Sequence, residues 1–326
     1  MDNLLEEKLK HLRQLTEEQM LAIIDKSFPC YLYDPMRYVV TAGGKKLRPL
    51  LLLMVCEALG ESISHALPAA AAIEMVHDFS LVHDDIMDHD DLRRGRLTVH
   101  KKWDESVAIL AGDGLLVYAF RALSRCPPQV VPRLLDMFSS SIIAVCEGQS
   151  LDKTFEQQDQ VSLQEYKEMI LLKTGKLFGL SCEMGAVLAN GNQDQVDAMR
   201  SFGEHLGTVF QIQDDLLDLT ATEMNLGKDV GSDIKEGKKT WPVLHFIQHA
   251  RPDQLQAFER LTNGHVGPDQ ILEIVELFSK AGSIQAAEQS LRQELETLRN
   301  ALQILPDNQA SAALRQIVAL IEKRDR

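Results

Sequence analysis

Apolar residues recur at positions i, i+3, i+4 and i+7 over most of the chain, whereas the alternating pattern of strands is nearly absent. This periodicity predicts an all-α fold. Pro49 fits the first turn of a helix, and Asn190-Gly191-Asn192 is typical of a helix end. The predicted helices cover residues 4–26, 48–59, 67–88, 104–123, 129–150, 162–190, 194–220, 239–250, 252–262, 267–281, 283–304 and 308–323.

No break in composition and no long Gly/Ser linker divides these helices, so residues 1–326 are predicted to form a single-domain helical bundle. Two segments, 89–103 and 221–238, are polar, contain glycine and lack periodicity. Each directly follows an aspartate-rich stretch in a predicted helix. They are therefore predicted to be loops, at the place where a lid over a site is expected.

Both aspartate-rich stretches have acids at positions i, i+1 and i+4. A helix turns about 100° per residue, so the acids at i and i+4 share one face. Like charges at this spacing destabilise a helix, which indicates that a cation lies between the two stretches. Carboxylate oxygens suit Mg²⁺, which usually joins one or two carboxylates to a substrate phosphate. The stretches therefore predict Mg²⁺ ions that hold a diphosphate, and their acids are Asp84, Asp85 and Asp88, then Asp214, Asp215 and Asp218.

Composition narrows the class of protein. The chain has 326 residues, is 45% hydrophobic and carries a formal charge of 34 − 48 = −14. A general attraction to nucleic acid or to an anionic membrane is therefore not expected. The five cysteines contain no CxxC pair, which favours a reducing cytoplasm. No signal-peptide pattern begins the chain, and no uncharged stretch approaches the roughly 20 residues that span a bilayer, so stable membrane insertion is not expected.

Basic residues cluster in three places. Gly43–Pro49 contains two lysines and an arginine before a predicted helix, and Arg93-Arg94-Gly95-Arg96 follows the first acidic stretch. Gly-rich turns and helix N-termini bind phosphate well, although a solvated basic turn is an equally good reading of the first cluster. The third cluster, Lys173-Thr174-Gly175-Lys176, lacks the glycines and the strand of a P-loop, so nucleotide binding is disfavoured.

Seven motifs resemble, in the same order, those of trans-isoprenyl diphosphate synthases, the polyprenyl synthetase family. The resemblance implies an isoprenoid synthase fold with a central cavity between the aspartate helices, and a motif-bearing core of about residues 30–285. It also implies a Mg²⁺-dependent, homodimeric prenyltransferase that joins isopentenyl diphosphate to dimethylallyl, geranyl or farnesyl diphosphate. The motifs are GGKKLRP (43–49), HDDIMDHDDLRRG (83–95), LAGDGLL (110–116), EGQ (147–149), KTGKLF (173–178), FQIQDDLLD (210–218) and GKDVGSDIKEGKKT (227–240).

The resemblance assigns roles to single residues. Up to three Mg²⁺ ions, with Mn²⁺ as a possible substitute, are expected on Asp84, Asp88 and Asp214, while Asp85, Asp215 and Asp218 act through water or indirect contacts. Thr174 and Gln211 are expected to face the allylic cation; with Arg93 and Lys173 they form the predicted catalytic set. The cations expected to hold the allylic diphosphate are Arg93, Lys173, Lys228 and Lys238. The residues expected to hold isopentenyl diphosphate are Lys45, Arg48, His77 and Arg94.

Some of these residues have a structural alternative. His77 could be a packed histidine hydrogen-bonded within its helix, but its place seven residues before Asp84 favours the substrate role. Asp233 matches an acid of the loop that closes over the metals. Lys235 and Lys239 are expected to be solvated.

Product length is predicted from the helix below the first acidic motif. Phe79 lies five residues before Asp84, which places it about 7.5 Å further down the helix. A ring there, beside Ser80 and above the smaller Val76, would stop a growing chain at 20 carbons. Packing of Phe79 against a neighbouring helix is the structural alternative. Geranylgeranyl diphosphate is therefore the favoured product, as in archaeal-type enzymes, with farnesyl diphosphate next and longer polyprenyl diphosphates after it.

Two other functions are less compatible with these motifs. A class I terpene cyclase usually carries an Asn/Ser/Glu metal motif in place of the second aspartate motif. A non-catalytic subunit of a heteromeric synthase tends to lose metal ligands, and here none is lost.

Overall fold

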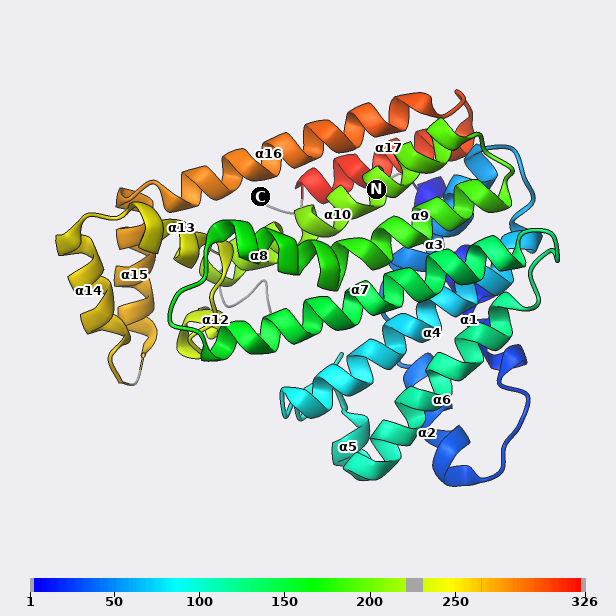
Figure 1. The fold of residues 1–326 in the computed structure, drawn as a ribbon, viewed down its shortest axis with the longest axis horizontal. Coiled ribbons are helices and arrows are strands. Elements are labelled where there is room, and N and C mark those ends of the chain that lie inside the picture. Colours follow the sequence, from blue (N-terminus) through cyan, green and yellow to red (C-terminus); the bar gives the residue numbers. More distant parts are fainter. Residues whose placement is uncertain (1–2, 221–230, 265, 324–326) are drawn as a thin grey trace. The chain divides into compact units, whose positions relative to one another are not determined.

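The computed structural model describes residues 3–220, 231–264 and 266–323, and the chain divides into two compact units. Unit 1 comprises Met1–Ile142, Leu177–Gly203 and Ala301–Leu320, and unit 2 comprises Ile143–Lys176, Glu204–Asn300 and Ile321–Arg326. Apart from one short hairpin, the regular structure of the described residues is helical (Figure 1). The predicted all-α class is confirmed, while the extent of a single domain stays a prediction.

Unit 1 is built around the long helix α4 (Ile63–Met87), which packs against α1 (Asn3–Ile23), α3 (Leu47–Ala58) and α6 (Glu105–Leu123). α4 and α6 lie side by side (Figure 1). The fully buried alanines at 69–72 allow neighbouring helices to approach α4 closely. The remaining elements are α2 (Cys30–Val40), β1 (Leu92–Arg93), β2 (Arg96–Leu97), α5 (Val99–Lys102), the first part of α7 (Val131–Gln157), most of α9 (Lys176–Leu188), the start of α10 (Gln193–Thr220), a 3-10 turn (Leu302–Ile304) and α17 (Gln309–Glu322).

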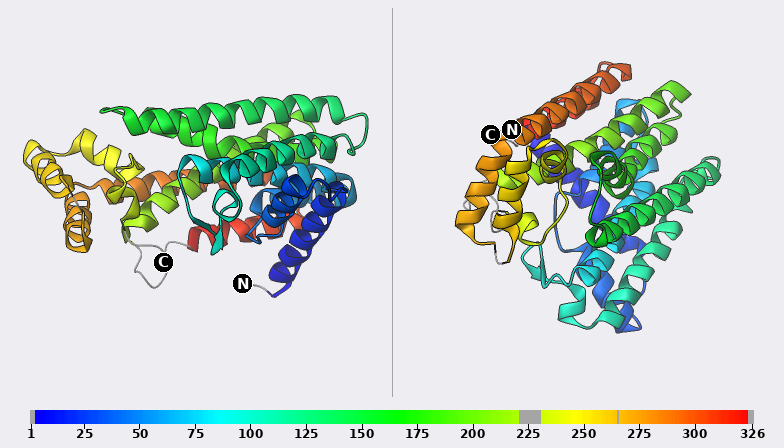
Figure 2. Two further views of the ribbon diagram at one scale, coloured as in Figure 1. Left: turned by 90° about the horizontal axis from the view of Figure 1, so that it is seen from below. Right: turned by 60° about the vertical axis from the view of Figure 1, so that its left-hand side comes forward.

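The described part of unit 2 contains the rest of α7 and α10 together with seven shorter elements. A capping box between Ser162 and Glu165 starts α8, because the hydroxyl and the carboxylate each accept a backbone N–H of the other residue. Near α14 and α15, which lie next to each other (Figure 2), the rings of Phe246, Phe258 and Phe278 form the centre of a hydrophobic cluster. The elements are α8 (Leu163–Ile170), a π-helical segment (Leu171–Gly175), α12 (Ser232–Lys235), α13 (Trp241–His249), α14 (Pro252–Thr262), α15 (Pro268–Lys280) and α16 (Ser283–Ala301).

Every predicted helix has a counterpart at its place, and the helix end at Asn190 is confirmed by its positive φ of 55°. The sequence prediction missed α2, an 11-residue helix with Pro35 in its interior. The predicted helix 162–190 is interrupted by the π-helical segment. The loop prediction for 89–103 is corrected, since this segment forms the β1–β2 hairpin and α5.

α6 is a helix of the described chain that is long and apolar enough to cross a membrane by length and composition, and 50% of its apolar window is buried within the fold.

Candidate active site

The first acidic motif lies at the C-terminal end of α4 in unit 1. Asp84 is half-buried, and Asp88 is exposed at the C-cap of the helix. Asp85 points the other way and is buried, where it accepts a hydrogen bond from Arg93 Nε. Burial raises the pKa of Asp85 to about 6, against the opposing effect of the Arg93 charge. The motif thus presents Asp84 and Asp88 outward, while Asp85 is engaged by a protein cation.

A tight hairpin places Arg93 and Arg94 next to this motif. β1 and β2 pair through Leu92 with Leu97 and Arg93 with Arg96, and the two turn residues Arg94 and Gly95 have φ values of 53° and 73°. Positive φ at both positions is the geometry of the hairpin turn whose twist matches its strands. The turn sends the Arg94 side chain to the glycine loop, where Nη1 donates to Gly43 O at 2.5 Å.

The residues predicted to hold isopentenyl diphosphate lie in unit 1 on the glycine loop, α3, α4 and the turn of the β1–β2 hairpin. Lys45 is exposed in the glycine loop, and Arg48 stands in the first turn of α3. Arg48 Nη1 lies 3.2 Å from His77 Nε2 and the guanidinium covers the Phe178 ring at 4.2 Å. Burial and the Arg48 charge lower the pKa of His77 well below its usual value, so the ring is neutral and Nε2 accepts from Arg48. His77 therefore contacts Arg48, a basic residue that is predicted to bind the same substrate.

The second acidic motif lies on α10 in unit 2, and its middle aspartate is the centre of a buried network. Asp215 accepts hydrogen bonds from the Tyr166 hydroxyl, from Trp241 N at 2.8 Å and from Gln211 Nε2 at 3.1 Å. Burial raises the pKa of Asp215 to about 6, and these three donors oppose the shift. Asp214, in contrast, is exposed.

The third acid of that motif holds the chain that follows. Asp218 accepts from Ser232 Oγ at 2.7 Å and from the backbone N–H groups of Ser232 and Asp233 at 3.1 Å. Next along the chain, Lys238 pairs with Asp233 at 3.4 Å and with Glu236 at 2.8 Å. Asp218 therefore holds the start of α12 in place, and Lys238 lies next to Asp233 of this helix.

Lys173 and Thr174 lie in the π-helical segment, and both are half-buried. Lys173 Nζ donates to Asp152 on α7 at 2.5 Å. The close approach of α7 requires glycine at 148, since an added Cβ there would lie 2.3 Å from the backbone N of Lys173. π-helical bulges are frequent at functional sites because they re-aim side chains within a helix.

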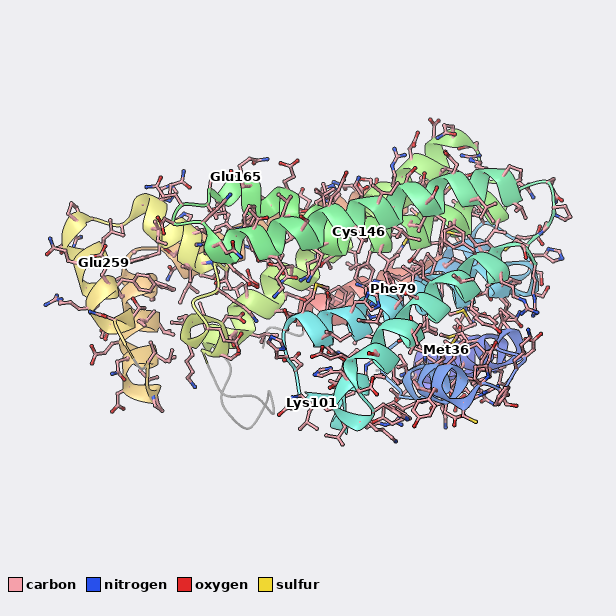
Figure 3. All side chains as sticks on the ribbon, turned by 60° about the horizontal axis from the view of Figure 1, so that its bottom comes forward. Met36, Phe79, Lys101, Cys146, Glu165 and Glu259 are labelled. Atoms are coloured by element: carbon pink, nitrogen blue, oxygen red, sulfur yellow. The ribbon has the colours of Figure 1, made fainter. Side chains whose placement is uncertain are left out.

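The predicted chain-length residues lie on α4 below the first motif. Val76 is buried, and Ser80 is half-buried with its hydroxyl on His77 O at 2.8 Å. Phe79, shown where α4 runs alongside α6 (Figure 3), is half-buried and packs edge-on against His83, with ring centroids 4.7 Å apart. His83 in turn occupies the space that a Cβ at Gly112 of α6 would need.

The sequence missed several partners that the fold supplies. Tyr166, Trp241 and Asp152 lie outside the seven motifs, and each is more than 20 residues in sequence from the residue that it contacts, so no spacing rule could find them. The expectation that Lys239 is solvated is wrong, because its Nζ is half-buried and donates to the carbonyl oxygens of Phe155 and Gln158. Lys228 lies outside the described residues.

The carboxylates of both motifs fit Mg²⁺. In the described part of the chain, no three His, Cys, Asp or Glu side chains gather into a complete metal site. Mg²⁺ does not need one, since it is usually held by one or two carboxylates together with substrate phosphates and water. The half-buried Asp84 and the exposed Asp88 and Asp214 offer oxygen ligands of this kind.

The chain is similar in sequence and in structure to known proteins. The model of the polyprenyl synthetase family matches residues 29–278. A short chain isoprenyl diphosphate synthase of Methanothermobacter thermautotrophicus is 36% identical, with coverage of 97% of this chain and 98% of that protein. A geranylgeranyl diphosphate synthase of Methanosarcina mazei is 36% identical, with coverage of 93% and 94%. The structure of a geranylgeranyl pyrophosphate synthetase from Pyrococcus horikoshii superposes with a TM-score of 0.92 at 39% identity, over 97% of this chain and 98% of that one.

Two further relatives are named for another product or were solved with bound ligands. A geranylfarnesyl diphosphate synthase of Natronomonas pharaonis is 35% identical over 98% of this chain and 97% of that protein. The structure of a polyprenyl synthase from Caulobacter crescentus, with a TM-score of 0.84 and 28% identity over 99% and 96% of the two chains, is complexed with calcium and isoprenyl diphosphate.

Proposed function

The chain belongs to the polyprenyl synthetase family and is a trans-prenyl diphosphate synthase, and from this premise we propose that its product is geranylgeranyl diphosphate. The observation that carries the proposal is Phe79, a half-buried ring five residues before Asp84 that His83 holds in place by edge-on packing. A ring held at that depth would limit the product to about 20 carbons. Relatives named for geranylgeranyl diphosphate support this length, and the relative named for geranylfarnesyl diphosphate marks the alternative of a longer product.

The site residues act chiefly through charge. The family is metal-dependent, and Mg²⁺ bound through Asp84, Asp88 and Asp214 would neutralise the departing diphosphate. In the structure each of three basic residues has a carboxylate partner: Arg93 pairs with Asp85, Lys173 with Asp152 and Lys238 with Asp233. We assign these three cations, with Lys228, to the allylic diphosphate.

The second substrate would be held by Lys45, Arg48 and Arg94, with the neutral His77 beside Arg48. After ionisation, the double bond of isopentenyl diphosphate attacks the allylic cation. The Thr174 and Gln211 oxygens are assigned to stabilise that cation, and the released diphosphate takes the proton. Water must be excluded during these steps, because it would quench the cation.

A homodimer in the cytoplasm is part of the proposal. α6 carries the exposed apolar residues Ile109, Leu110 and Val117 at helical spacing. An exposed apolar face of this kind favours contact with a second copy of the chain.

The test is a product analysis. Purified protein with Mg²⁺, labelled isopentenyl diphosphate and farnesyl diphosphate is expected to yield a 20-carbon diphosphate on chromatography, and none without metal. Products that end at 15 carbons, or that extend to 25 or more, would disprove the proposed length and leave the family assignment intact.

A further inference from the structure

Three ionisable side chains are buried next to the glycine loop of unit 1. Lys46 is 5% exposed, and Glu74 and Asp78 on α4 are 0% exposed. Lys46 Nζ donates to Val40 O at 3.1 Å and lies 3.7 Å from Glu74 Oε1. Glu74 and Asp78 stand one helical turn apart, so both carboxylates lie on the same face of α4. Lys46 therefore forms an ion pair with one member of a buried acidic pair, Glu74.

The carboxyl oxygens of this acidic pair lack hydrogen bonds among the described residues. Among the described residues, none of the four carboxylate oxygens of Glu74 and Asp78 has a hydrogen-bond partner. Burial, and then the Glu74 charge, raise the pKa of Asp78 to about 8, so the Asp78 carboxyl is mostly protonated at neutral pH. Buried polar groups without partners are rare and cost stability, so their presence calls for a role.

The position of Lys46 indicates that role. It is the N-cap residue of α3, with the left-handed backbone angles φ 44° and ψ 43°, and its side chain points inward instead of capping the helix. The residue before it, Lys45, is exposed, and Arg48 two residues later contacts His77. Glu74 and His77 are three residues apart on α4. The same stretch of α4 therefore holds the start of α3 at two points.

We propose that the buried Lys46–Glu74 ion pair is a positioning element that orients Lys45 and Arg48 toward isopentenyl diphosphate. The inference rests on the proposed function of these two residues. Because Glu74 neutralises the charge of Lys46, Lys46 is not itself a diphosphate ligand. The left-handed turn at Lys46 instead directs this side chain inward to Val40 O and Glu74, and it leaves the preceding Lys45 exposed.

The experiment compares Glu74→Gln, Lys46→Met and the double variant Lys46→Met/Glu74→Gln. Each single variant leaves one buried charge unpaired and is expected to unfold at a lower temperature, whereas the double variant removes both charges and recovers much of that loss. If the pair orients the loop, the double variant still has a KM for isopentenyl diphosphate raised on the order of tenfold, with the KM for the allylic substrate unchanged. The matched control is Lys8→Met/Glu57→Gln, which removes a more exposed ion pair and is expected to change neither KM.

A second variant keeps the test decisive if the double variant does not fold. Glu74→Asp retains both charges but withdraws the carboxylate by one methylene, and it is expected to raise the KM for isopentenyl diphosphate severalfold. A folded double variant, or a folded Glu74→Asp variant, with the wild-type KM for isopentenyl diphosphate would overturn the inference. Failure of the wild-type protein to consume isopentenyl diphosphate would instead reject the proposed function on which the inference rests.

Discussion

The Tyr166 hydroxyl on α8 donates a hydrogen bond to the buried Asp215 carboxylate on α10. The second acidic motif therefore depends on a residue that lies far from it in the sequence. Asp215 belongs to the same stretch of α10 as Asp214 and Asp218, and its three hydrogen bonds help to hold that stretch in place.

Replacing Tyr166 with phenylalanine tests this dependence through pH. The folded-state pKa of Asp215 is raised from 3.8 to about 6, so the stability contributed by its protonated form is full below about pH 3.8 and is lost as the pH rises through about 6. Above that pH the ionised carboxylate needs its donors. Tyr166→Phe should therefore cost about 1–3 kcal/mol at pH 7.5 and less at pH 5. Denaturant unfolding of the metal-free protein at both pH values measures the difference.

The control for Tyr166→Phe is Tyr31→Phe, which alters an exposed tyrosine. It is expected to leave stability unchanged at either pH. An equal loss at pH 5 and pH 7.5 in Tyr166→Phe would mean that the hydroxyl does not serve the ionised carboxylate.

Asp84→Ala is expected to lower kcat about a hundredfold or more while the fold is retained, because a carboxylate assigned to Mg²⁺ is removed. The dependence of the rate on Mg²⁺ concentration should move to higher concentrations. Asp91→Ala is the matched control, since Asp91 is an exposed acid nearby whose carboxylate pairs with Lys101 at 2.8 Å. Comparable losses in the two variants would argue for a general effect of surface charge.

Phe79→Ala is expected to lengthen the product beyond 20 carbons. The ring packs against His83, so its loss opens space on α4 below Asp84. Chromatography of the dephosphorylated products measures chain length, and the total turnover serves as the check on folding. Phe28→Ala, which removes an exposed ring, should leave the product unchanged. An unchanged product in Phe79→Ala would show that the ring only packs against its neighbours.

The sequence predicted features that depend on local periodicity and spacing. The two acidic motifs, the helices that bear them and the end at Asn190 follow from such patterns. The network around Asp215 does not, because Tyr166 and Trp241 reach it from other helices. The difference in burial between the two lysines of the glycine loop is also a tertiary effect. Lys45 and Lys46 are adjacent and of the same residue type, yet Lys45 is exposed and Lys46 is buried. Lys239 was misjudged for the same reason, as its partners are carbonyl oxygens at the end of α7 and just beyond it.

Gly148→Ala is expected to displace the π-helical segment. An added Cβ would lie 2.3 Å from Lys173 N and 2.7 Å from Lys173 Cα, which is closer than packed atoms tolerate. The KM for the allylic substrate should rise about tenfold, and unfolding should require about 1–3 kcal/mol less. The KM for isopentenyl diphosphate should stay near its wild-type value, since its assigned residues lie in unit 1. Cys146→Ala, an exposed position on the same helix (Figure 3), is the control, and a matching allylic KM defect there would contradict the steric explanation.

The double variant Leu110→Glu/Val117→Glu tests the exposed apolar face of α6. Both side chains are exposed at 54% and 66%, so charge there does not disturb the core of the free chain. If a second copy covers this face, two carboxylates in the interface would be desolvated, and dissociation to monomers is expected. Sedimentation equilibrium gives the mass, and thermal unfolding shows whether the monomer stays folded. A control variant, Leu272→Glu, places one charge on an exposed position of α15 and should leave the mass unchanged. A wild-type protein that is monomeric, or a double variant that stays dimeric, would contradict this interface. If the wild type instead binds lipid vesicles and the same substitutions abolish that binding, the exposed face of α6 is a membrane-binding surface.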